Sequence, residues 1–452
     1  EYMGAALEPI LRELRAKHGP IVTLNIGSRP AIFISSAEIA HKALVQSGAM
    51  FASRPPALET SKILLSNQHT ITSAAYGPLW RILRQNFMSL IHPSKLHVFS
   101  DGRKWAVKNL IEDLREISEK SNQAVPVLGH IQRSIYSLLL FMCFGQELEQ
   151  NLVRRIVDVQ RTIMSNFIRF NTLNFMPRLG KIFFKQLWKE FMSIVKDQEN
   201  CLLPLIKAKK EGKNDGTPCY IDTLLDLKHP EEDRKLSDGE LVSLCSEFIN
   251  AGTDTSATAL QWVMANLVKY QRIQERVIDE IRKVVEPEQE INEEHISKMP
   301  FLKAVVLETL RRHPPGHFIL PRAVVEDTKL EGYDIPKEAI VNFTVAEMAR
   351  DGSVWEDPMV FKPDRFMTDD GDVVDLDIKG VQEIKMMPFG AGRRVCPAIS
   401  LAIYNQQYYV ANLVREFQWL PEENNEVDLS ETQDFTIVMK NPLKARVIPR
   451  IH

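Results

Sequence analysis

The sequence predicts a mainly α-helical protein with a minor β region, built as a single large domain over residues 1–452. From about Ala37 to Pro300, apolar residues recur mostly at helical spacing. Short extended runs separated by turn residues gather near the N-terminus, between Ala323 and Val345, and near the C-terminus. No internal repeat is visible, and no long linker rich in Ser, Gly or Pro divides the chain.

Composition excludes several classes of protein. The chain has 56 Lys plus Arg against 59 Asp plus Glu, a net charge of −3, which gives no global field for binding nucleic acid. Hydrophobic residues at 44% and charged residues at 25% are ordinary globular values and exclude wholesale disorder. The five cysteines are widely spaced without a CxxC pair, which argues against a disulfide framework and favours a reducing compartment.

Two features concern membranes. The longest apolar run, Leu138 to Phe144, is too short to span a bilayer. The chain begins at Glu1 rather than at an initiator Met, so we expect that an upstream segment has been removed.

The elements follow in order along the chain. A short amphipathic helix is expected to about His18, followed by two extended runs, Ile21–Asn25 and Ala31–Ser35, joined by a Gly/Pro turn. After the helical body, Ala323 to Val345 predicts a small sheet. At the C-terminus, Phe435–Met439 and Ala445–Ile448 predict another hairpin.

One long helix is predicted from Asp238 to about Tyr270, roughly 50 Å at 1.5 Å per residue. Ser237 and Glu240 form a capping box at its start. Its centre, residues 251–256 (AGTDTS), is poor helix material because Gly raises the entropic cost and Thr, Asp and Ser compete for backbone hydrogen bonds. In one interpretation, the helix admits a ligand beside Gly252, and Asp254 and Thr255 relay a proton to that ligand. In the other, the centre of the helix is a tolerated kink.

A second helix, Phe301 to Arg312, ends at Pro314 and Pro315. Glu308 and Arg311 share one of its faces, and their apolar neighbours indicate that the pair is partly buried. A buried pair needs further hydrogen bonds, and Arg365 is the candidate third partner. By itself an ExxR spacing is a weak signal.

The most informative stretch is the loop around Cys396, residues 388–398 (PFGAGRRVCPA). Two glycines permit a tight backbone that can approach a flat ligand. Pro397 suits the first position of a helix, so the Cys396 sulfur would meet unpaired N–H groups and the nearby Arg394, which favour the thiolate. Three roles are open to Cys396. A nucleophile would need a nearby His, which is absent, and a structural thiol would not need this loop. A thiolate ligand of haem iron would need a tight loop, a bared sulfur and an Arg for a propionate, and all three are present.

With these residues in view, the sequence resembles the haem-thiolate monooxygenases, the cytochrome P-450 superfamily. The family's cysteine loop falls on Phe389, Gly392, Arg394 and Cys396, with Ala398 in place of the usual final Gly. The family's oxygen-activating helix motif falls on Ala251–Ser256, and its ExxR with a third partner falls on Glu308, Arg311 and Arg365. Its WxxxR falls on Trp80 and Arg84, and a further propionate-binding position falls on Arg322. The motifs span residues 76 to 398 in order, and the finer wording is most similar to plant microsomal members, by eye to the plant family numbered eighty-nine.

The resemblance implies a cytochrome P-450 fold that binds haem b (iron protoporphyrin IX), with Cys396 as the metal ligand. An anionic sulfur pushes electron density to the iron and favours O–O cleavage. Asp254 and Thr255 are the implied catalytic proton donors. The other implied cofactor-binding residues are Trp80, Arg84, Gly252, Arg322, Phe389, Gly392 and Arg394, and the structural ones are Glu308, Arg311 and Arg365.

The implied substrate pocket is lined by six residues and accepts an apolar small molecule: Phe248, Ala251, His317, Phe318, Ile319 and Ile437. For His317 a satisfied structural role is the alternative. The aromatic stretch from Phe167 to Phe184 is either core packing or a lid that dips into the membrane.

The implied activity is insertion of one oxygen atom from O₂ into an apolar metabolite. Because no flavin or nicotinamide motif is present, electrons are expected from NADPH through cytochrome P-450 reductase, docked near Arg81 and Arg393, with cytochrome b5 as an optional second donor. The implied location is the cytosolic face of the endoplasmic reticulum membrane, through an N-terminal anchor that this chain lacks. The alternatives are a haem-thiolate isomerase or dehydratase that uses no O₂, and a non-catalytic haem-binding protein.

Overall fold

A computed structural model describes residues 7–26, 29–120, 123–174, 182–212, 216–337 and 339–450. Its longer helices are α1 (Leu7–His18), α4 (Pro78–Leu90), α5 (Ser100–Lys120), α6 (Leu128–Phe144), α7 (Gln150–Phe170), α9 (Lys185–Lys210), α11 (Asp238–Lys269), α12 (Gln271–Val284), α14 (Pro300–Arg312) and α16 (Ile399–Glu416). The shorter helical elements are α2 (Ala37–His41), η1 (Lys42–Gln46), α3 (Glu59–Leu64), η2 (Pro93–Phe99), η3 (Asn171–Asn174), α10 (Tyr220–Leu225), α13 (Glu293–Ser297), α15 (Val345–Ala349), η4 (Pro363–Phe366) and η5 (Gly392–Arg394). Among these residues, no helix is long and apolar enough to cross a membrane.

The strands are short and form small sheets. A four-stranded sheet has the order β1 (Ile21–Ile26), β2 (Arg29–Ile34), β9 (Ile340–Phe343), β6 (Arg322–Ala323), and a three-stranded sheet has the order β10 (Phe417–Pro421), β13 (Lys444–Pro449), β3 (Val125–Pro126). Three two-stranded pairs are β11 (Glu431–Gln433) with β12 (Ile437–Met439), β4 (Lys228–His229) with β5 (Arg234–Lys235), and β7 (Thr328–Leu330) with β8 (Tyr333–Ile335). The predicted mainly helical fold with a minor β region is confirmed.

The chain divides into two compact units. Unit 1 contains residues 1–53, 107–132 and 255–452, and unit 2 contains residues 54–106 and 133–254. Helix α11 is continuous through the boundary, so it contributes its first half to unit 2 and its second half to unit 1. The interleaved segments mean that neither unit is one uninterrupted stretch of sequence.

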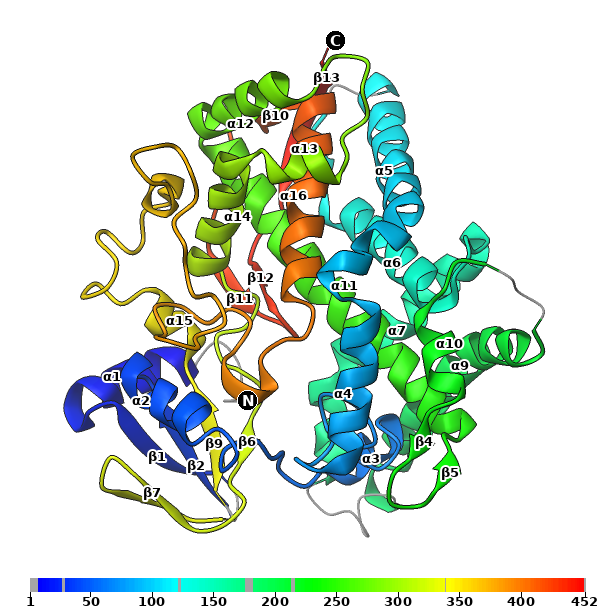
Figure 1. Ribbon diagram of the computed structural model, residues 1–452, viewed down its shortest axis with the longest axis vertical. Helices are drawn as coiled ribbons and strands as arrows, with labels where there is room; N and C mark the ends of the chain where they lie inside the picture. Colours follow the sequence, from blue (N-terminus) through cyan, green and yellow to red (C-terminus); the bar gives the residue numbers. More distant parts are fainter. Residues whose placement is uncertain are drawn as a thin grey trace. The chain divides into compact units, whose positions relative to one another are not determined.

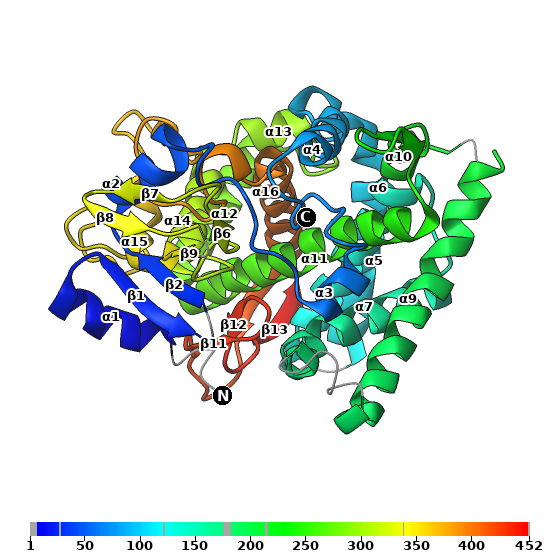
Figure 2. The same ribbon diagram turned by 90° about the horizontal axis from the view of Figure 1, so that it is seen from below.

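Unit 1 contains nearly all of the β structure. The antiparallel pair β1–β2 lies beside α1, and β2 then pairs in parallel with β9 (Figures 1 and 2). A core of buried aliphatic and aromatic side chains forms under this sheet and includes Ile34, Leu44, Val341 and Phe343. A second cluster joins α11, α14 and α16 through Ala259, Val306, Leu310 and Ile403. These two clusters hold the segments that flank the cysteine loop.

The predicted C-terminal hairpin is wrong. β12 pairs with the preceding strand β11, whereas β13 pairs with β10 and β3. The two runs lie close in sequence, but each pairs with another strand of unit 1. By contrast, the two expected N-terminal extended runs are strands, and they pair with each other. The small sheet after Arg322 also agrees with the expectation.

Candidate active site

Helix α11 remains helical through its weak centre, and the capping box closes its start. The Ser237 N–H donates to Glu240 Oε2 at 2.7 Å, and the Glu240 N–H donates to Ser237 Oγ at 3.3 Å. No break interrupts the helix at residues 251–256.

The centre of α11 is nevertheless unusual in its exposure. Residues 257–268 are buried, as are residues 241–250 apart from the half-buried Glu247. Between them, Ala251 is exposed, and Gly252, Asp254 and Thr255 are half-buried. An otherwise largely buried helix thus leaves its acid and its alcohol partly exposed, and a proton relay would need them to be accessible.

Gly252 permits close packing of two helices in unit 2. A Cβ built on Gly252 would lie 2.7 Å from Leu139 Cδ1 of helix α6, in unit 2. The missing side chain therefore lets α6 and α11 pack closely.

The cysteine loop is fixed by main-chain contacts within unit 1. The Cys396 N–H donates to Phe389 O at 2.9 Å, and the Ala398 N–H points at the Cys396 sulfur, 3.4 Å away. Gly390 and Gly392 have φ values of +71° and +69°, which favour glycine. Helix α16 begins at Ile399 rather than at Pro397, so the expected position of Pro397 as first helical residue is wrong.

Gly392 also permits a close backbone approach. A Cβ on this residue would lie 1.8 Å from Leu44 O in the π-helix η1. Arg394 Nε donates to Ala52 O at 2.7 Å, which fixes the other side of the loop to the N-terminal segment. The neighbouring Ser53 pairs with Ala323, directly after Arg322, a guanidinium that is 2% exposed. Two arginines of unit 1 are therefore tied to one short segment.

The loop and the second half of α11 are joined within unit 1. Phe389 packs with Ala259 of α11 and Ile403 of α16. Gln406 Nε2 on α16 donates to Ser256 O at 2.8 Å, one residue after Thr255. Helix α16, which follows Cys396, thus contacts α11 at the residue next to Thr255, the alcohol of the predicted proton relay.

The predicted buried ion pair is present, with its third partner. Arg311 Nε lies 2.7 Å from Glu308 Oε2, and both side chains are fully buried. Arg365 Nε lies 3.2 Å from the same carboxylate, and the Lys362 N–H donates to Glu308 Oε1 at 2.8 Å. Arg311 Nη1 donates to Ala349 O at 2.9 Å. These hydrogen bonds supply the compensation that a buried pair needs.

In unit 2, Trp80 and Arg84 lie one turn apart on α4. Trp80 is 6% exposed, and the guanidinium carbon of Arg84 lies 5.5 Å from its ring centroid. Phe248 on α11 packs against Phe87 and Tyr220, with ring centroids 5.6 and 5.1 Å away. Phe248 therefore contributes to an aromatic core at the start of α11.

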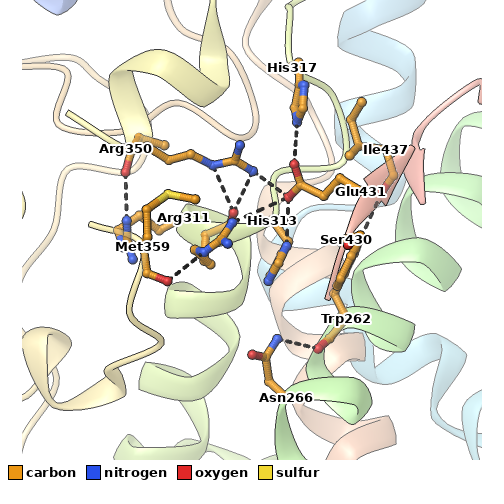
Figure 3. Close-up of polar contacts among 12 residues, drawn as sticks. Trp262, Asn266, Arg311, His313, His317, Arg350, Met359, Ser430, Glu431 and Ile437 are labelled. Carbon is orange, nitrogen blue, oxygen red and sulfur yellow. Dashed lines mark hydrogen bonds and ion pairs between the residues drawn. The ribbon is translucent and has the colours of Figure 1, made fainter. Parts of the chain in front are cut away.

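The predicted pocket residues of unit 1 are engaged by the protein. The Phe318 ring meets Phe33 edge-on with centroids 6.0 Å apart, and the Ile319 N–H donates to Phe343 O at 3.2 Å. Ile437 is 1% exposed, and its carbonyl accepts from Trp262 Nε1 at 2.9 Å (Figure 3). Of the aromatic stretch 167–184, residues 175–181 lie outside the described residues, Phe170 is buried, and Phe183 is 73% exposed.

His317 belongs to a network that sequence reasoning missed. Its ring contacts Glu8 through Nδ1 and Glu431 through Nε2, the latter at 3.1 Å. His313 Nδ1 and Arg350 Nη2 also contact Glu431, at 2.8 and 2.5 Å (Figure 3). Burial alone would lower the pKa of His317, but hydrogen bonds with Glu431 and Glu8 outweigh it, so the pKa is raised. These contacts favour the structural alternative for His317. The sequence near His317 gives no sign of them, because its partners Glu8 and Glu431 lie far away in the chain.

The residues of this loop fit a haem. The four other cysteines are buried, whereas Cys396 is half-buried. A backbone N–H directed at its sulfur favours the thiolate, and the buried Arg322 suits a carboxylate of such a group. The fold and this loop together define a haem-thiolate protein.

Comparison with known proteins gives the family. The sequence profile of the family "Cytochrome P450" matches residues 3–448. The chain is 45% identical to "Cytochrome P450 89A9" of Arabidopsis thaliana, over 98% of this chain and 88% of that protein. It is 30% identical to "Phenylacetaldehyde oxime monooxygenase CYP71AN24" of Prunus mume, over 98% of this chain and 85% of that protein. A solved zebrafish cytochrome P450 structure with abiraterone has a TM-score of 0.82 at 22% identity, covering 98% of this chain and 100% of that one.

The chain belongs to the cytochrome P450 family, and the predicted similarity to plant family eighty-nine is confirmed. It is a monooxygenase of small molecules whose cofactor is haem b, and the family implies a separate redox partner. The alternatives without O₂ chemistry are not favoured.

Proposed function

We propose that Cys396 would hold haem b as its thiolate ligand, and that Asp254 and Thr255 would deliver the protons for oxygen activation. The observation that carries this proposal is the cysteine loop: one half-buried cysteine, held by the Cys396–Phe389 hydrogen bond, with the Ala398 N–H directed at its sulfur. Haem, once bound, supplies the redox chemistry that activates O₂. The protein orients the sulfur, holds the cofactor and moves protons at Thr255 Oγ1.

Four residues are the proposed partners of the haem propionates: Arg322, Arg394, Trp80 and Arg84. Burial of Arg322 and the bond from Arg394 to Ala52 O preorganise the first two within unit 1. In unit 2, the stacking of Arg84 on Trp80 restricts the guanidinium. Ala251, Phe248, Ile319 and Ile437 are the proposed apolar lining of the substrate pocket. The proposed haem-thiolate domain extends over residues 1–452.

The ligand assignment is tested by the spectrum of the reduced carbon-monoxide complex. The wild type should show the strongly red-shifted Soret band of thiolate ligation, and Cys396→Ser should lose it. Cys201→Ser, in a buried cysteine away from the loop, should keep it. A red-shifted band in Cys396→Ser, or its absence from a haem-loaded wild type, contradicts the proposal.

We further propose that NADPH–cytochrome P-450 reductase, with cytochrome b5 as a second donor, supplies electrons at the cytosolic face of the endoplasmic reticulum membrane. The exposed side chains of Arg81 and Arg393, one in each unit, are the proposed contacts for an acidic partner. Because exposed charges are screened by salt, reductase-driven turnover should fall as ionic strength rises. Turnover that stays constant from low to high salt contradicts this docking mode.

A further inference from the structure

A group of three side chains in unit 2 lies apart from the residues proposed to bind haem. His69 follows helix α3, His229 ends strand β4, and Glu240 lies in the first turn of α11. One ligand atom from each lies within 4.8 Å of the other two. Three segments far apart in the sequence thus bring two imidazoles and a carboxylate close together.

His229 is buried without a hydrogen-bond partner for its ring among the described residues. Its side chain is 2% exposed, and neither ring nitrogen makes a hydrogen bond with the described residues. The His69 ring lies 5.0 Å away at an interplanar angle of 46°, so the two rings do not stack. Leaving a buried polar group without a hydrogen bond costs free energy. A ligand that accepts electron pairs from an imidazole nitrogen would recover this cost.

Glu240 supplies the negative charge. His69 Nδ1 lies 2.6 Å from Glu240 Oε1, and Arg234 contacts both carboxylate oxygens at 2.7 and 2.9 Å. The Ser237 N–H also donates to Glu240 Oε2 at 2.7 Å, so three partners fix the orientation of this carboxylate.

Glu232 restores the charge that Arg234 neutralises. Arg234 Nε lies 2.5 Å from Glu232 Oε2, and Glu232 Oε1 lies 3.9 Å from His229 Nε2. Two glutamates and one arginine leave a net charge of −1 around the imidazoles. The surroundings therefore favour a cation, and Glu232 offers a fourth donor on the solvent side, where its side chain is 48% exposed.

We propose that His69, His229 and Glu240, completed by Glu232, bind a divalent transition-metal cation of the zinc type. Imidazole nitrogens with carboxylate oxygens are the donor set that Zn²⁺ takes in proteins, with four ligands in a structural site. The cation would replace the hydrogen bond between His69 Nδ1 and Glu240 Oε1, and the proton of that bond would be released to solvent. Arg234 keeps its contacts with the remaining carboxylate lone pairs.

The site has a defined structural consequence. Residues 66–68, just before His69, have φ values of +45°, +57° and +68°, a left-handed run that costs free energy in non-glycine residues. Beyond it, the Ile71 and Thr72 N–H groups donate to Glu247 of α11 at 2.9 and 2.7 Å. A cation on His69 would fasten the loop 66–72 to the start of α11 and to the β4–β5 hairpin.

The test uses the haem-loaded protein, dialysed against a chelator and then equilibrated with micromolar free Zn²⁺. Elemental analysis should find one zinc per chain in the wild type. His229→Phe should lose this zinc, because Phe fills the buried slot without a donor. His97→Gln, which alters an exposed histidine of the same unit, should retain it.

Folding is checked separately, because zinc should also raise the thermal unfolding midpoint of the wild type and not that of His229→Phe. The reduced carbon-monoxide spectrum of each variant reports whether the haem-loaded fold is intact. The proposal is overturned if the wild type takes up no zinc, or if a folded His229→Phe binds as much as the wild type. Neither outcome depends on the ligand of the haem.

Discussion

At the residue scale, two glycines of the cysteine loop have the same left-handed backbone but different neighbours. A Cβ on Gly392 would meet Leu44 O at 1.8 Å, whereas a Cβ on Gly390 would meet only Ile319 Cγ2 at 3.6 Å. Backbone carbonyls cannot move aside as side chains can. The difference between the two sites is therefore one of contact and not of φ.

We expect Gly392→Ala to lose the thiolate spectrum of the carbon-monoxide complex. Gly390→Ala, the matched control, should keep it and lose about 1–2 kcal/mol of unfolding free energy for the left-handed alanine. Spectra of the two purified variants at equal haem content measure this. Equal behaviour would show that the approach to Leu44 O is not required.

Thr255 and Ser256 are adjacent hydroxyl residues, both half-buried on α11. If Thr255 delivers protons, Thr255→Ala should divert reducing equivalents toward peroxide and lower the ratio of product to NADPH consumed, on the order of several-fold. Ser256→Ala should leave this ratio unchanged, since its carbonyl bond with Gln406 is retained. Unchanged coupling in Thr255→Ala would remove it from the relay.

At the element scale, helix α14 is locked to the loop around η4 by Glu308. Replacing Glu308 by Gln leaves the fully buried Arg311 and the nearly buried Arg365 without a counterion. Breaking a buried pair in this way costs about 3–5 kcal/mol. We expect Glu308→Gln to lower the denaturant midpoint strongly and to reduce haem retention.

The control for Glu308 lies on the same segment. Asp364 pairs with Arg276 at 2.8 Å, and both side chains are about half exposed. Asp364→Asn should cost no more than about 1 kcal/mol. Comparable losses in both variants would mean that burial does not set the strength of the Glu308 network.

Elements are also where prediction from sequence worked best. The capping box at Ser237 and Glu240, the ExxR pair and the two N-terminal strands are local patterns, and the structure has them. The strand runs at the C-terminus were recognisable, but their partners were not, because pairing is decided by burial against distant segments. For the same reason, the sequence could not predict the packing of Leu139 against Gly252, or the contact between His69 and Glu240, which are 171 residues apart.

At the scale of the whole molecule, charged groups from distant parts of unit 1 meet around His317. Glu8, Glu431 and Arg350 face one another across its ring, with Arg12 on Glu8 and His313 and Arg312 on Glu431. Hydrogen bonds from these imidazoles and from Arg350 lower the pKa of Glu431 against the effect of burial. Burial lowers the pKa of His313 to about 4, so the two histidines shift in opposite directions.

These shifts predict a pH dependence. Because the pKa of His317 is raised above its usual 6.5, its contribution to stability is complete below pH 6.5 and is lost as pH rises through the folded-state pKa. The difference in unfolding free energy between wild type and His317→Gln should be largest near pH 6 and shrink towards pH 9. Denaturant unfolding at several pH values measures it, and His18→Gln, in an exposed histidine, should show no such trend. A difference that is constant with pH would refute the assignment.

The attachment of the cysteine loop to the first 53 residues also dictates an order of assembly during synthesis. Arg394 and its acceptor Ala52 are 342 residues apart, so at roughly 10 residues per second the acceptor leaves the ribosome about half a minute before its donor. All of unit 2 is translated in that interval and can become compact first. Strands β1 and β2 can pair with each other early, but the edge of β2 that pairs with β9 stays open until β9 has been synthesised, and an open strand edge is prone to pair with other chains.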